Sequence, residues 1–226
     1  MTPAIEQRRV RWQAACRIVP TRYPTINLYD RVADEADFDA LYALEAMSND
    51  RLRDELGRIE LVPKDERVFG PGSGPIMAAF THLNPLGSRF SDGSYGVFYA
   101  ARERATAVAE TAHHHGRFLA ATRQPAMHLP MRLYQVEIDA RLHDLRPAGH
   151  EAEHDPRSYT ASQALGRRLK GAGSAGIVYR SVRRAGGYCA GLFTPRGAKA
   201  CKHAAYLLYA WDGERFADIY EKVGAS

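Results

Sequence analysis

From residue 96 onward, the chain contains short apolar runs that are separated by glycine, proline and polar residues. These runs span 96–100, 132–138, 177–179, 189–193, 206–209 and 216–220. Short runs bounded by turn-forming residues are typical of β-strands, because a strand crosses a small core in a few residues before the chain must turn. We therefore expect strands to dominate the C-terminal half.

Longer segments with helical spacing lie before and between these runs. Residues 34–47 carry acids in the first turn and apolar residues at helical spacing, namely Phe38, Leu41, Tyr42 and Leu44. Further helices are expected over 102–118 and 158–170, in a continuation over 50–56, and from Pro75, which suits a first helical turn. Strands and helices together predict an α+β fold.

The N-terminal part of the chain is expected to extend a larger domain. Residues 1–14 are polar and rich in arginine, which favours a helix or a frayed lead-in, and residues 16–20 favour a short strand. Residues 62–75 hold several prolines and glycines, so we expect a loop. Because about 60 residues are marginal as an independent core, we predict an N-terminal helical extension over 1–75 that packs on a domain over 76–226.

The charge balance narrows the class of partner. Lys and Arg number 31 against 26 Asp and Glu, which gives a formal net charge of +5 and favours anionic partners. The basic residues are scattered among acids, and neither an aromatic RNP pattern nor a zinc-finger spacing accompanies them. An anionic small molecule or an acidic protein is therefore favoured over direct nucleic-acid binding.

The apolar runs and the cysteines indicate the cellular compartment of the protein. No apolar run approaches the roughly 20 residues that a membrane span needs, and the N-terminus shows no apolar leader. The three cysteines, Cys16, Cys189 and Cys201, have no CxxC spacing. We expect reduced thiols in a cytoplasmic protein that engages no membrane, with Cys189 packed inside a strand.

Two motifs match ligand-binding patterns only in part. Residues 171–176 (GAGSAG) have the spacing of a dinucleotide fingerprint, but they follow a predicted helix and precede a predicted strand, which is the reverse of the required order. We expect a helix cap and a tight turn there. The histidines at 113–115 lie beside Glu110, and Glu110 and His114 share a helix face. Because no further ligands are identifiable, we predict no metal.

Three segments place a polar residue beside a predicted strand or on an apolar helix. Arg89 lies in GSRFS, Tyr99 lies near the end of the run GVFYA, and Glu110 follows in the helical stretch TAVAET. Ser181 ends the run GIVYRS and is followed by the glycine pair at 186–187. Taken singly, each has an ordinary structural explanation, such as a solvated carboxylate, a cap, a half-buried ring or the end of a strand.

Taken together, the segments resemble the RES-domain family, whose members are the toxins of bacterial toxin–antitoxin pairs. The family is named after an Arg, a Glu and a Ser, which match Arg89, Glu110 and Ser181 in order, spacing and context. The resemblance covers roughly residues 80–220. Residues 1–75 resemble the extension of a longer subgroup.

The resemblance implies a mixed β core similar to that of ADP-ribosyltransferases, and consumption of NAD without a metal. Cleavage of the nicotinamide–ribose bond develops positive charge on the ribose, which a carboxylate such as Glu110 would stabilise. Arg89 would bind the phosphates, because guanidinium groups suit bidentate phosphate contacts. Ser181 would hydrogen-bond the ribose or the amide, Tyr99 would stack on the nicotinamide ring, and Arg180 is a further predicted NAD contact.

The resemblance also implies a helix-turn-helix antitoxin that covers the active site. The acceptor of the ADP-ribose stays open between water, phosphate and a protein. Also open is which of Arg17, Arg22 and Arg31 reaches the cleft. Alternative functions are a nucleic-acid-directed toxin, which predicts binding that falls steeply with salt, and a non-catalytic binding module.

Overall fold

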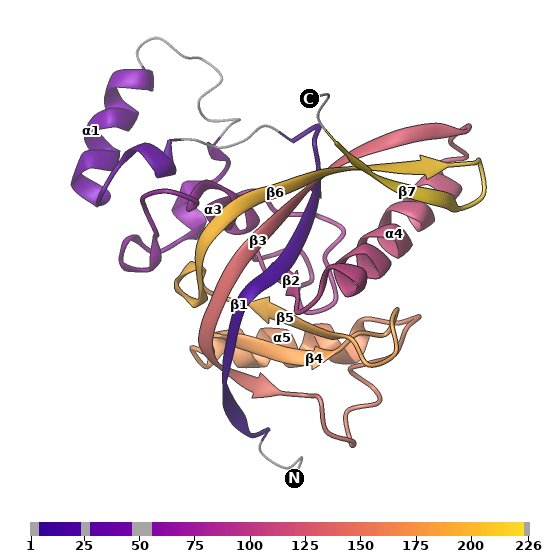
Figure 1. The fold of residues 1–226 in the computed structure, drawn as a ribbon. Helices are drawn as coiled ribbons and strands as arrows, with labels where there is room; N and C mark the ends of the chain where they lie inside the picture. Colours follow the sequence, from indigo (N-terminus) through magenta and orange to yellow (C-terminus); the bar gives the residue numbers. More distant parts are fainter. Residues whose placement is uncertain (1–4, 24–27, 47–55, 224–226) are drawn as a thin grey trace.

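The computed structural model describes residues 5–23, 28–46 and 56–223 and shows a curved sheet with helices packed on it (Figure 1). The strands are β1 (Gln7–Pro20), β2 (Phe98–Ala101), β3 (Met127–Asp144), β4 (Gly176–Arg180), β5 (Tyr188–Leu192), β6 (Ala198–Trp211) and β7 (Phe216–Lys222). The α-helices are α1 (Glu35–Ala46), α3 (Gly74–Thr81), α4 (Arg104–Ala121) and α5 (Thr160–Gly171). Short 3-10 turns are η1 (Tyr29–Arg31), η2 (Ile59–Leu61), η3 (Lys64–Glu66) and η4 (Pro195–Gly197).

Strand β3 connects the two halves of the sheet. The seven strands follow the order β1-β2-β5-β4-β3-β6-β7, and β1 also pairs with β3. Only β3 and β4 pair in parallel among the described strands, whereas the other pairings are antiparallel. The sheet is therefore mixed, which confirms the predicted α+β class.

The expectation of a helix or a frayed lead-in before residue 15 is wrong for the described residues, because β1 already begins there. Val10 and Trp12 are buried, whereas Arg9 and Arg11 between and beside them are exposed. This alternation has the period of a strand with one buried face. Arg9 also forms an ion pair with Asp139 of the neighbouring strand β3. The arginines that suggested a solvated lead-in are the outer face of a strand.

Most other predicted elements are confirmed, but β3 and β6 are much longer than the predicted runs 132–138 and 206–209, and η3 lies in the predicted loop over 62–75. Helix α3 carries Pro75 in its first turn, and α1, α4 and α5 lie in the predicted helical segments. Helix α5 ends at Gly171, Gly173 has a φ of +74°, and Gly176 opens β4. The segment 171–176 is therefore a cap and a turn, as predicted. The expected helix over 50–56 lies outside the described residues except for Leu56, which is helical.

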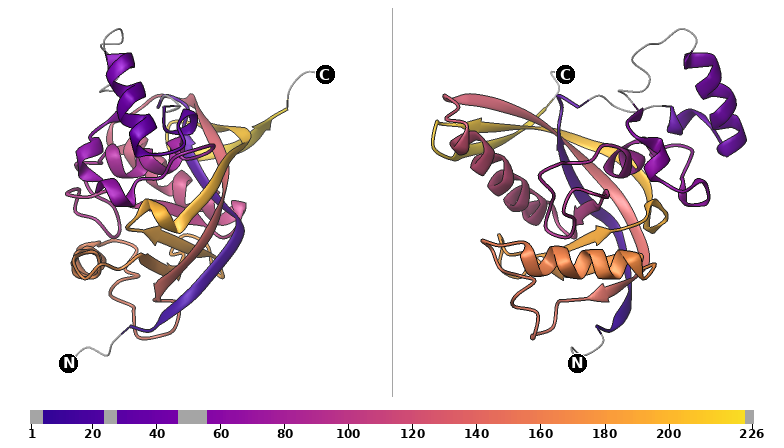
Figure 2. Two further views of the ribbon diagram at one scale, coloured as in Figure 1. Left: turned by 90° about the vertical axis from the view of Figure 1, so that its left-hand side faces the viewer. Right: turned by 180° about the vertical axis from the view of Figure 1, so that it is seen from behind.

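The sheet is packed on both faces. Ala15 and Cys16 are neighbours in β1, so their side chains point to opposite faces, and they belong to two separate buried clusters. The cluster of Ala15 includes Phe38 of α1 and residues of α3, whereas the cluster of Cys16 includes Ala107 of α4 and Leu165 of α5. Figure 2 shows α1 standing away from the sheet and α4 and α5 lying along it.

The division of the chain at residue 75 stays a prediction. Strand β1 pairs with β3 from Gln7↔His143 to Pro20↔Met131, so the segment before residue 75 supplies a strand of the same sheet. The helical elements α1, η2 and η3 follow β1 in that segment.

The loop before β2 is clamped between α5 and the sheet. Gln163 of α5 donates through its side chain to the carbonyls of Ser88 (3.0 Å) and Ser91 (3.2 Å). A Cβ atom on Gly166 would lie 2.1 Å from the carbonyl oxygen of Phe90. Glycine at this position therefore lets α5 approach the backbone of the loop.

We expect Gly166→Ala to lower the free energy of unfolding by about 1–3 kcal/mol, because the added methyl group forces α5 away from the loop. Urea denaturation of the purified protein would measure the change. Gly171→Ala is the matched control at the end of the same helix, because a Cβ there meets nothing within 4 Å. Equal midpoints for the two variants would contradict the role of Gly166.

Candidate active site

The candidate site lies where β2 and β4 end. Strand β5 runs antiparallel to both, so β2 and β4 point the same way and finish at the same edge of the sheet. Ala101 at the end of β2 pairs with Cys189, and Arg180 at the end of β4 pairs with the adjacent Tyr188. Because α4 follows β2 directly and Ser181 follows β4, the topology brings the first half of α4 to Ser181.

Glu110 and Ser181 form a hydrogen-bonded pair at this edge. The Ser181 hydroxyl donates to Oε1 of Glu110 at 2.7 Å. Oγ of Ser181 in turn accepts from the backbone N–H groups of Arg183 (3.1 Å) and Arg184 (3.0 Å). The Glu110 side chain is 16% exposed, and its Oε2 lies 3.9 Å from Nε2 of His114. The carboxylate is therefore held in place through its Oε1 atom, and the side chain stays partly accessible to solvent.

Arg89 is buried and holds the segment that precedes α5. Its residue exposure is 6%, and its Nη1 donates to the carbonyls of Glu153 and Asp155, both at 3.1 Å. The guanidinium carbon lies 4.7 Å from the centroid of the Tyr159 ring. The charged group is thus paired with carbonyl dipoles and a ring face, which compensates for its loss of water.

Tyr99 fixes the loop on both sides of Arg89. Its hydroxyl forms a hydrogen bond with the hydroxyl of Ser88 (2.9 Å) and accepts one from the backbone N–H of Phe90 (2.9 Å). Burial raises the pKa of the Tyr99 phenol well above its ordinary value, so the group stays protonated. Tyr99, which lies in β2, therefore holds the loop around Arg89 in place.

His154 lies beside Arg180 at the end of β4, a contact that the sequence reasoning missed. Its Nδ1 is 2.7 Å from the carbonyl oxygen of His150, to which it donates, and its Nε2 accepts from the backbone N–H of Arg180 at 3.1 Å. Both bonds together require the neutral ring with the proton on Nδ1. Burial lowers the pKa of His154 and favours the same form. Segment 143–158 appears in the sequence as a polar loop without periodicity, so no pattern marks these contacts.

The three N-terminal arginines differ in their surroundings. Arg17 donates through Nη1 to the carbonyl of Tyr99 at 3.0 Å. The guanidinium carbon of Arg22 lies 5.1 Å from the centroid of the Tyr23 ring, and Arg22 and Arg31 are both exposed. Arg17 therefore contacts the strand that carries Tyr99.

The histidines of α4 are uncharged near neutral pH. Burial lowers the pKa of His113, His114 and His115 to about 4 in each case. The charge of Arg183 adds to this effect at His113 and His114. The described residues contain no group of three or more His, Cys, Asp and Glu that could hold a metal ion.

The three cysteines lie in the interior of the fold. Cys16, Cys189 and Cys201 are free and buried. Cys189 lies in β5, where burial raises the pKa of its thiol far above the ordinary value, so that the nucleophilic thiolate does not form. Within the described ranges no helix combines the length and the apolar character needed to cross a bilayer.

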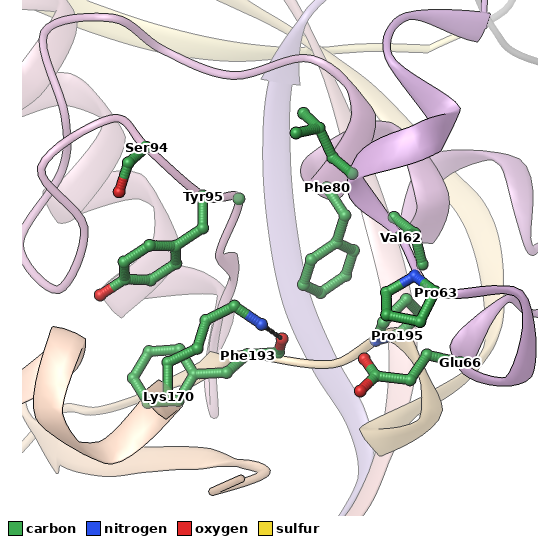
Figure 3. Close-up of a pocket in the computed structure, with 11 residues that line it drawn as sticks. Val62, Pro63, Glu66, Phe80, Ser94, Tyr95, Lys170, Phe193 and Pro195 are labelled. Atoms are coloured by element: carbon green, nitrogen blue, oxygen red, sulfur yellow. Dashed lines mark hydrogen bonds between the residues drawn. The ribbon is translucent and has the colours of Figure 1, made fainter. Parts of the chain in front are cut away.

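A small cavity lies away from these residues (Figure 3). Its volume is about 40 Å³, and it lies between Val62 and Pro63 on one side and Tyr95 and Lys170 on the other. Ligand pockets for molecules of drug size or larger have volumes of about 300–1,000 Å³. This cavity is therefore too small for a dinucleotide, and it marks the contact between the segment around residue 62 and the rest of the fold.

The fold and the site define the class of protein: an α+β chain in which a carboxylate and a serine meet at the ends of two strands, among several arginines. A model of the RES domain family matches residues 65–212, and the chain therefore belongs to this family. The matched range begins after β1, although β1 lies in the same sheet.

Two individual proteins are similar to the chain over most of its length. An uncharacterised protein, y4oC, of Sinorhizobium fredii (strain NBRC 101917 / NGR234) is 28% identical over 207 residues, which cover 90% of this chain and 85% of the relative. The crystal structure of the M. tuberculosis MbcT–MbcA toxin–antitoxin complex contains a chain with a TM-score of 0.45 and 12% sequence identity, with coverage of 91% of this chain and 87% of that chain.

We expect the free energy of unfolding to fall as the pH is lowered from 7 to 5. Unfolded histidines take up a proton near pH 6.5, whereas those at 113 and 115 have a pKa of about 4 in the folded protein. The unfolded state therefore binds more protons in this window, and each histidine contributes a slope of at most about 1.4 kcal/mol per pH unit. Urea denaturation at both pH values would measure the change.

The double variant His113→Gln, His115→Gln is expected to show a shallower pH dependence than the unmodified protein. The same slope in both proteins would show that these histidines do not carry the effect.

Proposed function

We propose that the chain is the toxin of a bacterial toxin–antitoxin pair and that it cleaves the bond between nicotinamide and ribose in NAD. Membership of the RES domain family supports the class. The observation that carries the proposal is the hydrogen bond of 2.7 Å between Ser181 and Glu110, because it orients a carboxylate in a partly buried site. A carboxylate that is already oriented stabilises developing positive charge without the cost of reorganisation.

The proposed reaction needs one carboxylate and no metal. The C–N bond breaks with its electron pair moving to the nicotinamide ring, which leaves as a neutral molecule, and positive charge develops on the ribose. Glu110 stabilises that charge, as carboxylates do in glycoside cleavage. An acceptor then donates an electron pair to the ribose carbon and loses a proton. Water, phosphate and a protein side chain are the three acceptors that we consider.

The other residues of the site are proposed to bind and orient NAD. Ser181 holds Glu110 and faces the ribose or the carboxamide, Tyr99 lies in β2, and Arg180 lies at the end of β4. Arg89 is proposed to face the phosphates. Its Nη1 atom is already bonded to two carbonyls, so any phosphate contact would use its remaining N–H groups.

The proposed partner is a helix-turn-helix antitoxin that covers this site in the cytoplasm. The formal net charge of +5 and the arginines at 180, 183 and 184 favour an acidic segment on that partner.

We expect Glu110→Gln to reduce nicotinamide release from NAD by at least about 100-fold, because it removes the negative charge and retains the shape of the side chain. Chromatography of the products would measure nicotinamide and would separate ADP-ribose from its phosphorylated and protein-linked forms. Glu214→Gln, in the turn between β6 and β7, is the matched control and is expected to keep full activity.

The same variants are expected to differ in cells. Expression of the unmodified chain should lower cellular NAD and stop growth, and Glu110→Gln should relieve both effects. Absence of nicotinamide release by the pure protein, with phosphate and cell extract supplied, would contradict the proposed reaction. Binding of RNA that weakens steeply with salt would then favour a nucleic-acid-directed toxin.

A further inference from the structure

Strand β7 is the last strand of the sheet. It pairs with β6 and ends the strand order, so that among the described strands none lies on its outer side (Figure 1). Such an edge presents a row of backbone N–H and C=O groups that can pair with a further strand. The outer edge of β7 is therefore able to accept a strand from another chain.

The sheet beside this edge has one covered face and one open face. Leu207 and Tyr209 of β6 and Ile219 of β7 point to the covered face, where they pack in the cluster that includes residues of α4. Alternate residues point to the opposite face, where Tyr206 is 47% exposed and Tyr220 is 52% exposed. Two exposed rings next to an unpaired edge are typical of a contact surface.

The open face of β6 and β7 consists of three cross-strand rows. Each row joins one residue of β6 to one residue of β7, namely Tyr206 to Lys222, Leu208 to Tyr220, and Ala210 to Asp218. The middle row joins an aliphatic side chain to an aromatic ring. In β7, a basic residue therefore lies on one side of Tyr220 and an acidic residue lies at the same distance on the other side.

The two outer charges of this face are not used within the chain. Glu221, on the covered face, pairs with Arg104 at 2.7 Å. Neither Asp218 nor Lys222 has an ion-pair partner within the described ranges. Asp218 instead raises the pKa of the neighbouring Tyr220 phenol through a hydrogen bond and its charge. Both charges are therefore available to a second strand.

The order of the charges selects one register for the pairing of two β7 strands. A two-fold axis makes the strands antiparallel, and residues that lie directly opposite point to the same face. An axis at Tyr220 places Asp218 of each copy opposite Lys222 of the other. On the covered face the same axis places Ile219 opposite Glu221. An axis at Asp218 or at Glu221 would place like charges directly opposite, which is destabilising, and an axis at Ile219 would form no ion pair.

We propose that two copies of the chain associate through antiparallel pairing of their β7 strands about a two-fold axis at Tyr220. The sheet then continues from one copy into the other, and the two open faces form one surface. The contact is self-complementary, which is the requirement for an isologous dimer. It is independent of the proposed cleavage of NAD, because none of its residues belongs to the candidate active site.

Sedimentation at several protein concentrations tests the association. The unmodified protein is expected to reach twice the mass of one chain. Asp218→Lys and Lys222→Asp are each expected to raise the dissociation constant of the dimer at least about 10-fold, because two opposite-charge pairs become like-charge pairs. Both positions are exposed, so the thermal midpoint of the monomer is expected to stay unchanged. Lys202→Asp, at an exposed position of β6, is the matched control and is expected to keep the dimer.

An equimolar mixture of the two single variants separates a direct contact from a general effect of charge. The paired positions are then both basic in one variant and both acidic in the other. The mixture is therefore expected to form heterodimers with the dissociation constant of the unmodified dimer. The double variant Asp218→Lys, Lys222→Asp is expected to restore self-association in the same way.

Tyr220→Cys tests the axis itself, because a residue on a two-fold axis faces its own copy. Directly opposite Cβ atoms lie about 4.5–5.5 Å apart, close to the separation in a disulfide. Mild oxidation is expected to give a disulfide-linked dimer on a non-reducing gel, whereas Lys202→Cys is expected to stay monomeric. The native cysteines are buried. Equal cross-linking of the two variants would contradict the axis.

The mass of a single chain at every concentration, or a dimer that both charge reversals leave intact, would overturn the proposed contact. Loss of the dimer in both variants without recovery in the mixture would overturn the register. A monomeric chain whose binding to an antitoxin is lost in both variants would assign the edge to the antitoxin and would overturn the dimer.

Discussion

The hydroxyl of Ser181 uses its whole hydrogen-bonding capacity within the protein. It donates its one proton to Glu110 and accepts two backbone N–H groups, from Arg183 and Arg184. This one atom ties the end of β4 to α4 and sets the course of the turn that carries both arginines. A contact between Ser181 and a substrate hydroxyl must therefore share the proton given to Glu110 or replace one of the backbone donors.

The elements of the fold were predictable wherever the pattern of side chains is local. Helix α4 and the turn after α5 follow from periodicity and from glycine placement, as does the run of strands in the second half. The beginning of β1 was not predicted, although Val10 and Trp12 alternate with arginines there, because the same arginines suit a solvated helix equally well. Pairing with β3 decides between the two, and that partner lies far along the chain.

The sequence predicts the central residues of the candidate site but not the residues that surround them. Glu110 and Ser181 stand out beside apolar runs, and the structure brings them into contact. His154 carries no local signal, because its hydrogen bonds to His150 and Arg180 join a loop to a strand end. Its importance follows only from these bridging hydrogen bonds, which a sequence does not display.

The pairing of β1 with β3 has a consequence for synthesis of the protein. The side chains of Gln7 and His143 meet across a separation of 136 residues, and β4 and β6, the other two neighbours of β3, emerge later still. A chain growing on the ribosome therefore carries β1 as an unpaired strand until most of the sequence has been made. The edge that carries the Glu110–Ser181 pair is completed only afterwards, because β4 and β5 follow β3 in the sequence. Prematurely terminated chains that stop before β4 lack Ser181, and so cannot assemble the site.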